Sequence, residues 1–191
     1  VAVVAGATGC GKSTQVPQLL LEDADADGRR CKVVVTQPRR VAAVALAERV
    51  AAERGEACRL GDGDVGYSVR LERRGSSRTR LEFCTVGVLL RRLQRGGAFD
   101  ATHVVVDEAH ERDVLTDFLL VVLKTRVLPA CPGLKVVVMS ATLNAALFAD
   151  YFGGAAVLDI PGRLHDVAVR YVDEAAALVK KHPAKASRRA L

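Results

Sequence analysis

The sequence predicts an α/β fold in which a mostly parallel sheet carries helices on both faces. Two observations lead to this prediction. Short runs rich in Val alternate with longer amphipathic segments, which is the order that βα units produce. The Val-rich runs are continuously apolar rather than alternating, as expected for strands that are buried on both faces. With 191 residues, the chain is long enough to bury one core of ordinary domain size.

The predicted strands are the short apolar runs bounded by polar or turn-forming residues. The central four are expected at Val1–Ala5, Lys32–Thr36, His103–Asp107 and Lys135–Met139. Two more are expected at Val65–Glu72 and Thr79–Cys84, because the Arg-Gly-Ser-Ser stretch within 71–80 is typical of a turn between them.

Helix-like periodicity occupies the segments between these strands. The predicted helices are Ser13–Glu22, Val41–Arg54, Val86–Gln94 and Val114–Leu128. The face of the second helix expected to be buried is formed by Val41, Val44, Ala45 and Val50. The polar stretch Asp23–Arg30 predicts a surface loop. The basic tail that begins at Lys180 predicts a linker or a frayed end.

Composition narrows the class of protein. The net charge of +6, from 28 basic and 22 acidic residues, permits a polyanionic partner but does not identify one. No apolar run approaches the roughly 18–20 residues that span a bilayer, so no membrane association is expected. The five cysteines are widely spaced and form no Cys-x-x-Cys pair, which disfavours a zinc site or a disulfide framework. An intracellular, reducing compartment is therefore expected, either cytoplasm or nucleus.

The strongest motif is the glycine-rich loop from Gly6 to Ser13, which matches G-x-x-x-x-G-K-[ST] between a predicted strand and a predicted helix. Its backbone N–H groups can wrap a phosphate chain, and the helix N-terminus adds its dipole. Lys12 is expected to reach the β- and γ-phosphates, and the Ser13 hydroxyl to bind Mg²⁺. The alternative is a glycine-rich turn without a ligand, which motif and context together disfavour. The predicted nucleotide-binding residues are Gly6, Thr8, Gly9, Cys10, Gly11, Lys12, Ser13 and Thr14.

Two carboxylates, Asp107 and Glu108, end a predicted buried strand. Asp107 is expected to hold Mg²⁺ through water, and Glu108 to lie at the same metal site, where it orients and deprotonates an attacking water. Alone, such a pair could be a solvated loop. Together with the glycine loop it provides the second half of a Mg·nucleotide site.

Two further strand ends carry polar motifs. The hydroxyls of Ser140 and Thr142 are expected to hydrogen-bond to the Asp107–His110 segment and to couple it to the nucleotide state. The alternative for that motif is a helix N-cap. Arg39 and Arg40 stand at a predicted helix start, which is a good place to bind a backbone phosphate. The alternative for these arginines is surface solvation.

These motifs, in this order, resemble those of the DEAH-box RNA helicases, a class of superfamily 2, and the chain is similar to their first RecA-like (ATP-binding) domain. Asp107-Glu108-Ala109-His110 spells the class name, and the continuation Glu111-Arg112-Asp113 is similar to the RNA helicase A-like branch. Thr36–Ala43, Thr85–Leu93 and Ser140–Thr142 resemble motifs Ia, Ib and III. The resemblance extends from Val1 to about Tyr171, with departures at Ala7, Val86 and Asp166 that remove no catalytic group.

The resemblance implies a RecA-like P-loop NTPase that uses ATP or other NTPs with Mg²⁺ and binds RNA. It implies catalytic roles for Lys12, Asp107, Glu108 and His110, the last as the residue that couples the nucleotide site to other motifs. Arg49 matches an arginine that stacks on the nucleotide base. The residues that match RNA-facing positions are Arg39, Arg40, Thr85 and Gly87, together with Arg70 near a hairpin.

The resemblance also sets the expected domain organisation. Residues 1–172 correspond to the ATP-binding domain and 173–191 to a linker towards a second RecA-like domain. That domain and the C-terminal helicase domains are expected in cis, so this stretch alone should bind nucleotide weakly and hydrolyse it slowly. Two alternatives remain beside an ATP-dependent helicase: a catalytically silent, helicase-like RNA-binding or scaffold module, and a P-loop enzyme of another class, such as a small-molecule kinase.

Overall fold

The computed structural model describes residues 1–56, 60–95, 99–141 and 145–162, together with Val169, Tyr171, Val172 and Glu174. Several positions singled out in the sequence therefore lie outside the described residues. They are Cys58, Thr142, Asp166 and nearly all of the predicted linker 173–191.

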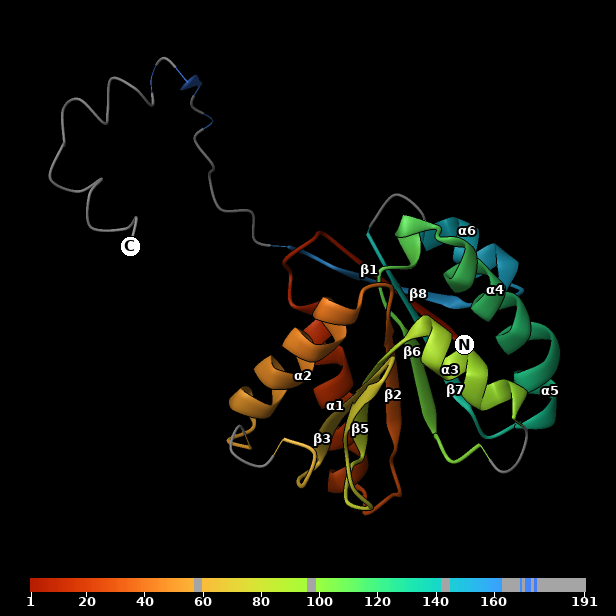
Figure 1. The fold of residues 1–191 in the computed structure, drawn as a ribbon. Helices are drawn as coiled ribbons and strands as arrows, with labels where there is room; N and C mark the ends of the chain where they lie inside the picture. The colour runs from red at the N-terminus through yellow and green to blue at the C-terminus, as the bar shows by residue number, and fades with distance from the viewer. Residues whose placement is uncertain are drawn as a thin grey trace, which may run out of the picture.

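One sheet of eight strands forms the centre of the fold (Figure 1), in the order β4-β3-β5-β2-β6-β7-β1-β8. Its strands are β1 (Ala2–Gly6), β2 (Val33–Gln37), β3 (Val65–Val69), β4 (Glu72–Arg74), β5 (Leu81–Thr85), β6 (His103–Val106), β7 (Lys135–Ser140) and β8 (Ala156–Ile160). Every neighbouring pair is parallel except β3 and β4. The mostly parallel sheet is confirmed, and its parallel strands present their carboxyl ends at one edge.

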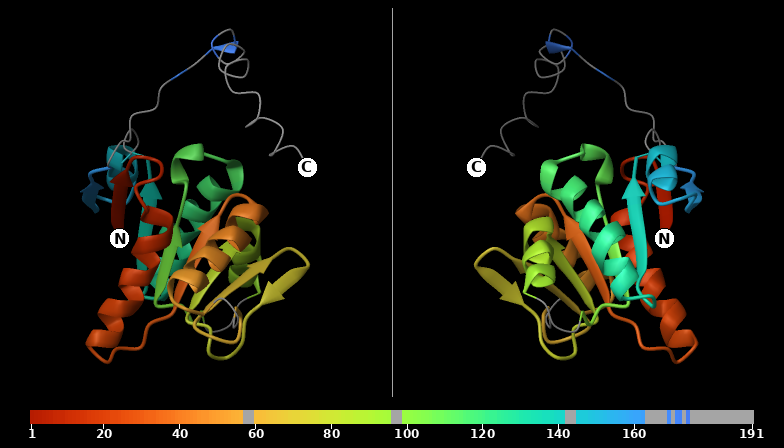
Figure 2. Two further views of the ribbon diagram at one scale, coloured as in Figure 1. Left: turned by 90° about the vertical axis from the view of Figure 1, so that its left-hand side faces the viewer. Right: turned by 90° about the vertical axis from the view of Figure 1, so that its right-hand side faces the viewer.

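Helices cover both faces of this sheet, as Figures 1 and 2 show. On one face lie α1 (Lys12–Ala26) and α2 (Arg40–Glu53). On the other face lie α3 (Val86–Gln94), α4 (Val114–Val122), the π-helical segment η3 (Leu123–Val127), α5 (Leu128–Ala130) and α6 (Ala145–Tyr151). Within the described ranges, no helix is both long enough and apolar enough to cross a membrane.

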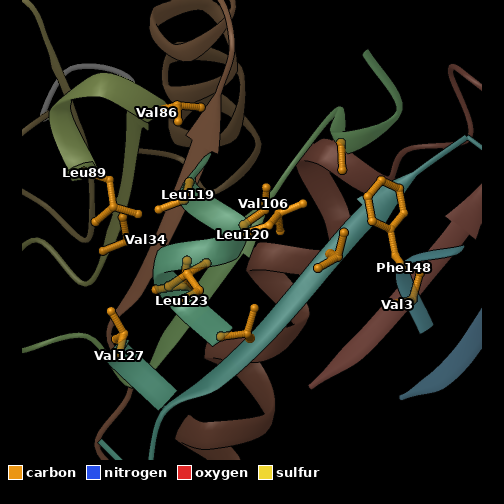
Figure 3. Close-up of a cluster of buried hydrophobic side chains, with 14 of the residues drawn as sticks. Val3, Val34, Val86, Leu89, Val106, Leu119, Leu120, Leu123, Val127 and Phe148 are labelled. Carbon is orange, nitrogen blue, oxygen red and sulfur yellow. The ribbon is translucent and has the colours of Figure 1, made fainter. Parts of the chain in front are cut away.

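The central strands are buried on both faces because successive side chains pack into two separate cores. In β6, Val104 and Val106 join the core under α3, α4 and α6, whereas Val105 joins the core under α1 and α2. In β2, Val34 belongs to the first core and its neighbours belong to the second. Figure 3 shows the first core, to which α4 contributes Leu119 and Leu120 and η3 contributes Leu123. Burial on both sides explains why these strands read as continuous apolar runs.

Two predictions about α1 and α2 were wrong in detail. The first helix continues to Ala26, so the polar stretch Asp23–Arg30 is only partly loop. The second helix buries Val50 as predicted, but the rest of its buried face differs: Val41 is 78% exposed, and the other buried residues are Ala43, Ala47 and Ala51. Alanines spaced four apart bring the helix axis close to the sheet, and this packing decides which side faces inward.

The predicted strand Val65–Glu72 was also wrong, because the chain turns back after Val69. Leu71 adopts a positive φ of 66°, which a bulky residue rarely does, and β4 returns antiparallel to β3. The return is close: a Cβ added to Gly66 would stand 2.5 Å from the carbonyl oxygen of Arg74. Glycine is therefore required at this position for the hairpin to lie against the sheet.

The edge strand β8 was not predicted. It pairs in parallel with β1, and Ile160 lies opposite Gly6. Four of its five residues are exposed, so it lacks the continuously buried pattern of the central strands. Its end also supports the glycine loop, since a Cβ on Gly6 would meet the Ile160 carbonyl oxygen at 3.1 Å and the Cys10 Sγ at 2.9 Å.

A buried histidine, His103, lies at the other end of the sheet from the glycine loop. It begins β6, is 5% exposed, and its Nδ1 lies 2.8 Å from the Thr102 hydroxyl and 3.6 Å from the Cys31 Sγ. Burial lowers the pKa of His103 below its ordinary 6.5, and the nearby positive charges of Lys135 and Arg29 lower it further. The folded protein therefore holds this ring neutral.

We predict that the free energy of unfolding falls as the pH drops below about 6.5. The unfolded chain gains a proton at His103 through that range while the folded chain resists it, so the contribution is complete above 6.5 and is lost below it. Urea denaturation at about pH 7.5 and pH 5.5 should show a loss of up to about 1 kcal/mol that is absent in His103→Gln. An equal loss in the variant would contradict the assignment.

Candidate functional site

The glycine loop connects β1 to α1 in a shape that only glycine adopts easily. Gly9 and Gly11 have φ angles of 83° and 92°, in the left-handed region. Gly11 stands before the first residue of α1 and provides no side-chain cap. The Thr14 and Gln15 amides donate to the Gly11 carbonyl, and the preceding amides of Lys12 and Ser13, which have no side-chain cap, are available to an anion.

Lys12 is held within the curve of this loop. Its Nζ donates hydrogen bonds to the carbonyl oxygens of Gly6 at 2.5 Å and Ala7 at 3.0 Å, and lies 3.5 Å from the Cys10 Sγ. All of these partners are uncharged. Among the described residues no carboxylate forms an ion pair with this ammonium group, so its charge suits a polyanionic ligand.

Asp107 stands directly after β6 and is only 1% exposed. Its Oδ2 accepts a hydrogen bond of 2.5 Å from Gln37 Nε2, and its Oδ1 accepts one of 2.9 Å from the Glu108 amide. Gln37 ends the neighbouring strand β2 and is equally buried. The carboxylate is thus fixed from two sides, and each oxygen retains a lone pair for a further ligand.

Gln37 is a site residue that the sequence reasoning missed. Gln37 belongs to the motif Thr36–Ala43, in which only Arg39 and Arg40 were predicted to have a function. A polar side chain at the end of a continuously apolar run was the available signal, because such a group needs a buried partner. That the partner is Asp107 depends on β2 lying beside β6.

Glu108 is held in a strained backbone conformation with a φ of 54°. A short 3-10 turn, η2 (Ala109–Glu111), follows, and the amide of Glu111 donates to the Glu108 carbonyl at 3.0 Å. Such strain is typical of functional sites. Burial raises the pKa of the Glu108 carboxyl above its ordinary value, and the negative charge of Asp107 raises it further. A carboxylate with a raised pKa is a stronger base.

His110 connects Glu108 to the end of β7. Its Nδ1 accepts a hydrogen bond of 3.2 Å from the Ala141 amide, and its Nε2 lies 3.3 Å from Glu108 Oε2. A neutral ring that accepts at Nδ1 carries its proton on Nε2, which then faces the carboxylate. The Ser140 hydroxyl, in contrast, donates to the Ala141 carbonyl at 3.0 Å. Among the described residues, the hydrogen bond from the end of β7 to the Asp107–His110 segment is therefore made by the Ala141 amide, and not by the Ser140 hydroxyl as predicted.

These groups converge on one cavity of about 280 Å³. Its lining comprises Thr8, Gly9, Gly11, Lys12, Ser13, Thr14, Arg49, Glu53, Glu108 and His110. Most of the predicted nucleotide residues are thus brought together, and Arg49 joins them from α2. Three predicted residues do not line the cavity. Gly6 and Cys10 lie within the glycine loop, and Asp107 is buried beneath the surface.

Glu53 is a second residue of this cavity that was not predicted. Its Oε1 accepts a hydrogen bond of 2.6 Å from Arg49 Nε, and its Oε2 accepts from Gln18 at 2.8 Å and from Gln15 at 3.1 Å. Arg49, followed by Gln18, lowers the pKa of this carboxyl. Glu53 therefore links α2 to the helix that carries the glycine loop and holds the Arg49 guanidinium at the cavity.

The residues predicted to face RNA gather along the same edge of the sheet. Thr85 ends β5 and precedes α3, Gly87 lies in the first turn of α3, and Arg70 follows β3. Arg39 and Arg40 follow β2 and form exposed ion pairs, with Glu111 at 3.2 Å and with Glu72 at 2.6 Å respectively. Exposed pairs of this kind are weak, so a phosphate can replace the carboxylate at modest cost.

Comparisons with known proteins agree with this geometry. Residues 1–149 match the family described as DEAD/DEAH box helicase. The chain is similar to the DExH-box ATP-dependent RNA helicase DExH3 of Arabidopsis thaliana, with 53% identity over 177 residues that cover 91% of the chain and 14% of that protein. It is also similar to the ATP-dependent RNA helicase DHX30, at 50% identity in Gallus gallus and 48% in Homo sapiens, over 95% of the chain and 15% of each protein. The chain thus spans about one seventh of the length of these relatives.

We predict that Gln37→Leu destabilises the fold because it removes one of two hydrogen bonds from a buried carboxylate. The free energy of unfolding should fall by about 1–3 kcal/mol, as measured by urea denaturation. Thr36→Val provides the matched control: it alters a buried polar residue of the same strand whose hydroxyl lies 3.4 Å from the Val105 carbonyl and does not contact Asp107. If both variants lose the same stability, Gln37 has no special role in holding Asp107.

Proposed function

This chain belongs to the DEAD/DEAH box helicase family, and from that premise we propose that it is the ATP-binding part of an ATP-dependent RNA helicase. In the whole protein, NTP hydrolysis would drive RNA unwinding or the remodelling of RNA–protein complexes. The observation that carries this proposal is the convergence of Lys12, Glu108 and His110 on one cavity whose floor is the glycine loop. Its similarity to proteins named as ATP-dependent RNA helicases supports it.

The glycine loop is the proposed site for the triphosphate. Backbone N–H groups of the loop and of the first turn of α1 surround the phosphates, and Lys12 exchanges its two carbonyl partners for phosphate oxygens. Arg49 lies across the cavity, where its guanidinium, held by Glu53, can stack on the base. Stacking does not depend on which base is present, so ATP is the proposed substrate and other NTPs are expected to bind as well.

Mg²⁺ is the proposed metal, held by the Ser13 hydroxyl and Asp107, with Glu108 close by. The structure fits such an ion because the Asp107 carboxylate is fixed by Gln37 and the Glu108 amide yet keeps a free lone pair on each oxygen. When bound, the metal would neutralise the charge that develops on the phosphate oxygens. A hydroxyl, a carboxylate, water and phosphates together form the oxygen set that Mg²⁺ prefers.

Glu108 is the proposed general base. Its raised pKa favours proton uptake from a water beside the terminal phosphate. His110 holds this carboxylate through Nε2 and is held in turn by the Ala141 amide. A movement of the β7 end would therefore shift the base, and this provides a physical route by which Ser140 and Thr142 could couple nucleotide state to the rest of the protein.

RNA is the proposed nucleic-acid partner, bound at the sheet edge through Arg39, Arg40, Thr85, Gly87 and Arg70. A second RecA-like domain and C-terminal helicase domains are the proposed partners in cis, joined through the linker 173–191. The described cysteines, Cys10, Cys31, Cys84 and Cys131, are free thiols, which supports an intracellular location in the cytoplasm or the nucleus.

We predict that Glu108→Gln in the full-length protein abolishes NTP turnover and leaves nucleotide binding within about two-fold, because the amide keeps the shape of the side chain but cannot accept a proton. Phosphate release measures turnover, and binding of a fluorescent ATP analogue measures affinity. Glu111→Gln is the matched control, since it changes a neighbouring carboxylate outside the cavity lining. Turnover that survives Glu108→Gln would favour the alternative of a silent RNA-binding module, in which this carboxylate has no catalytic task.

We also predict that Arg49→Ala weakens binding of ATP, GTP, CTP and UTP by a similar factor, about 3- to 10-fold, because stacking contributes about 1 kcal/mol and ignores base identity. Competition against a fluorescent nucleotide measures the four affinities, and Arg126→Ala serves as the control for removal of one exposed positive charge. A weakening confined to ATP would instead indicate base-specific hydrogen bonding by Arg49.

A further inference from the structure

A second cavity, of about 370 Å³, lies between the β3–β4 hairpin and α3 and does not belong to the nucleotide site. Its lining comprises Ser68, Val69, Arg70, Leu71, Arg73, Val88, Arg91, Arg92 and Arg95. Five of these nine residues are arginines and none is acidic. We refer to this feature as the arginine cavity. Only Arg70 among its arginines was singled out from the sequence.

One of the five arginines has a structural role. Arg92 donates two hydrogen bonds to the carboxylate of Glu82, at 2.7 Å and 2.5 Å, in a fork-like arrangement. Glu82 lies in β5 and is 6% exposed. This pair ties α3 to the sheet and neutralises the charge of Arg92, so Arg92 forms part of the cavity wall rather than a free anion-binding group.

The other four arginines, Arg70, Arg73, Arg91 and Arg95, are exposed. Within the described residues, none of them forms an ion pair or a side-chain hydrogen bond. Arg39, Arg40, Arg49, Arg80 and Arg112 do form such pairs. Arg74, Arg78 and Arg126 are also exposed and have no ion pair among the described residues, but they do not line this cavity. Four unpaired guanidinium groups around one concavity create a strongly positive local potential, and their planar donors match phosphate oxygens.

The arginine cavity adjoins the residues proposed to bind RNA, which we refer to as the RNA track: Arg39, Arg40, Thr85, Gly87 and Arg70. Val88 and Arg91 lie three residues apart on α3, and Arg95 follows four residues later as its C-cap. The three residues therefore lie on one side of the helix. That helix begins immediately after Thr85, and Gly87 precedes Val88. On the other wall, Arg70 belongs both to the proposed RNA contacts and to the cavity.

We propose that the arginine cavity is a second phosphate-binding site, which holds the RNA backbone one or more nucleotides beyond the contacts made by Arg39, Arg40 and Thr85. This inference rests on the proposed function and extends it by adding Arg73, Arg91 and Arg95. An RNA backbone is favoured over an acidic peptide because the cavity adjoins the proposed RNA contacts: Arg70 lines it, and Gly87 directly precedes the lining residue Val88.

The test measures RNA binding by the full-length protein with fluorescence anisotropy, using oligouridylates of about 6 and about 12 nucleotides, within the range of single-stranded site sizes. Three double variants are compared: Arg91→Gln with Arg95→Gln at the cavity, Arg39→Gln with Arg40→Gln at the proposed track, and Arg78→Gln with Arg126→Gln as the control. The control pair is exposed, has no ion pair among the described residues, and changes the net charge equally. Urea denaturation confirms that each variant is folded.

The expected result is a weakening that depends on RNA length. The cavity variant should bind the longer RNA roughly 10-fold more weakly, with its salt dependence reduced by about 0.7 in log–log slope for each phosphate that the variant no longer neutralises. It should bind the shorter RNA as the wild type does. The track variant should weaken binding of both RNAs, and the control variant should leave both nearly unchanged.

Other outcomes overturn the proposal in distinguishable ways. If the shorter RNA binds through Arg39 and Arg40 but the longer one gains nothing from Arg91 and Arg95, the cavity site is wrong and the proposed function stands. If a glutamate-rich peptide binds through Arg91 and Arg95 while RNA does not, the cavity serves an acidic protein partner. If neither RNA binds to the wild type, the RNA part of the proposed function fails and the cavity site fails with it. If the control variant is weakened as much as the cavity variant, the effect is one of net charge alone.

Discussion

The functional side chains of this protein depend on one constraint, which is that the central strands run parallel and are buried on both faces. Parallel strands share an edge at their carboxyl ends, and several polar residues of the site stand where these strands stop. Gly6, Gln37, Thr85, Asp107 and Ser140 all stand at or directly after such ends. Two cores, one under each helical layer, hold these strands in place. The glycine loop and the carboxylates therefore meet at the edge where the parallel strands end.

At that edge, the carboxylates of Asp107 and Glu108 lose hydration through burial, and a few hydrogen bonds hold them in place. Asp107 is almost fully buried and is held by Gln37 and by a backbone amide. Glu108 is kept in a strained backbone conformation, with a raised pKa and His110 beside it. Such an arrangement stabilises the fold little, since each charge loses hydration that its partners only partly restore. It makes sense as preparation for a ligand that brings charges of its own.

The arginines divide into two populations that have different physical consequences. Many are paired with carboxylates, as Arg49 is with Glu53 and Arg92 with Glu82, and these pairs position helices and orient the guanidinium groups. The four unpaired arginines of the arginine cavity keep their full charge at one place beside the strand ends. The net charge of the chain is thus not spread evenly over the molecule. Part of it is concentrated in the arginine cavity, which favours a continuous polyanion at this place.

The sequence by itself determined the features that local pattern encodes. The continuous Val-rich runs predicted the buried strands, the spacing of glycines with Lys12 and Ser13 predicted the phosphate loop, and the acid pair after a strand predicted the second half of the site. The boundaries of strands and helices differed from the prediction where tertiary contacts determine them, as at Arg70–Leu71, where the chain turns into β4. Only the tertiary structure decided which strands are adjacent, and with it the bond from Gln37 to Asp107, the clamp of Glu53 on Arg49, and the meeting of α3 with the β3–β4 hairpin around the arginine cavity. These contacts join residues far apart in the chain, and the strand order that brings them together leaves no trace in the spacing of residues along any one segment.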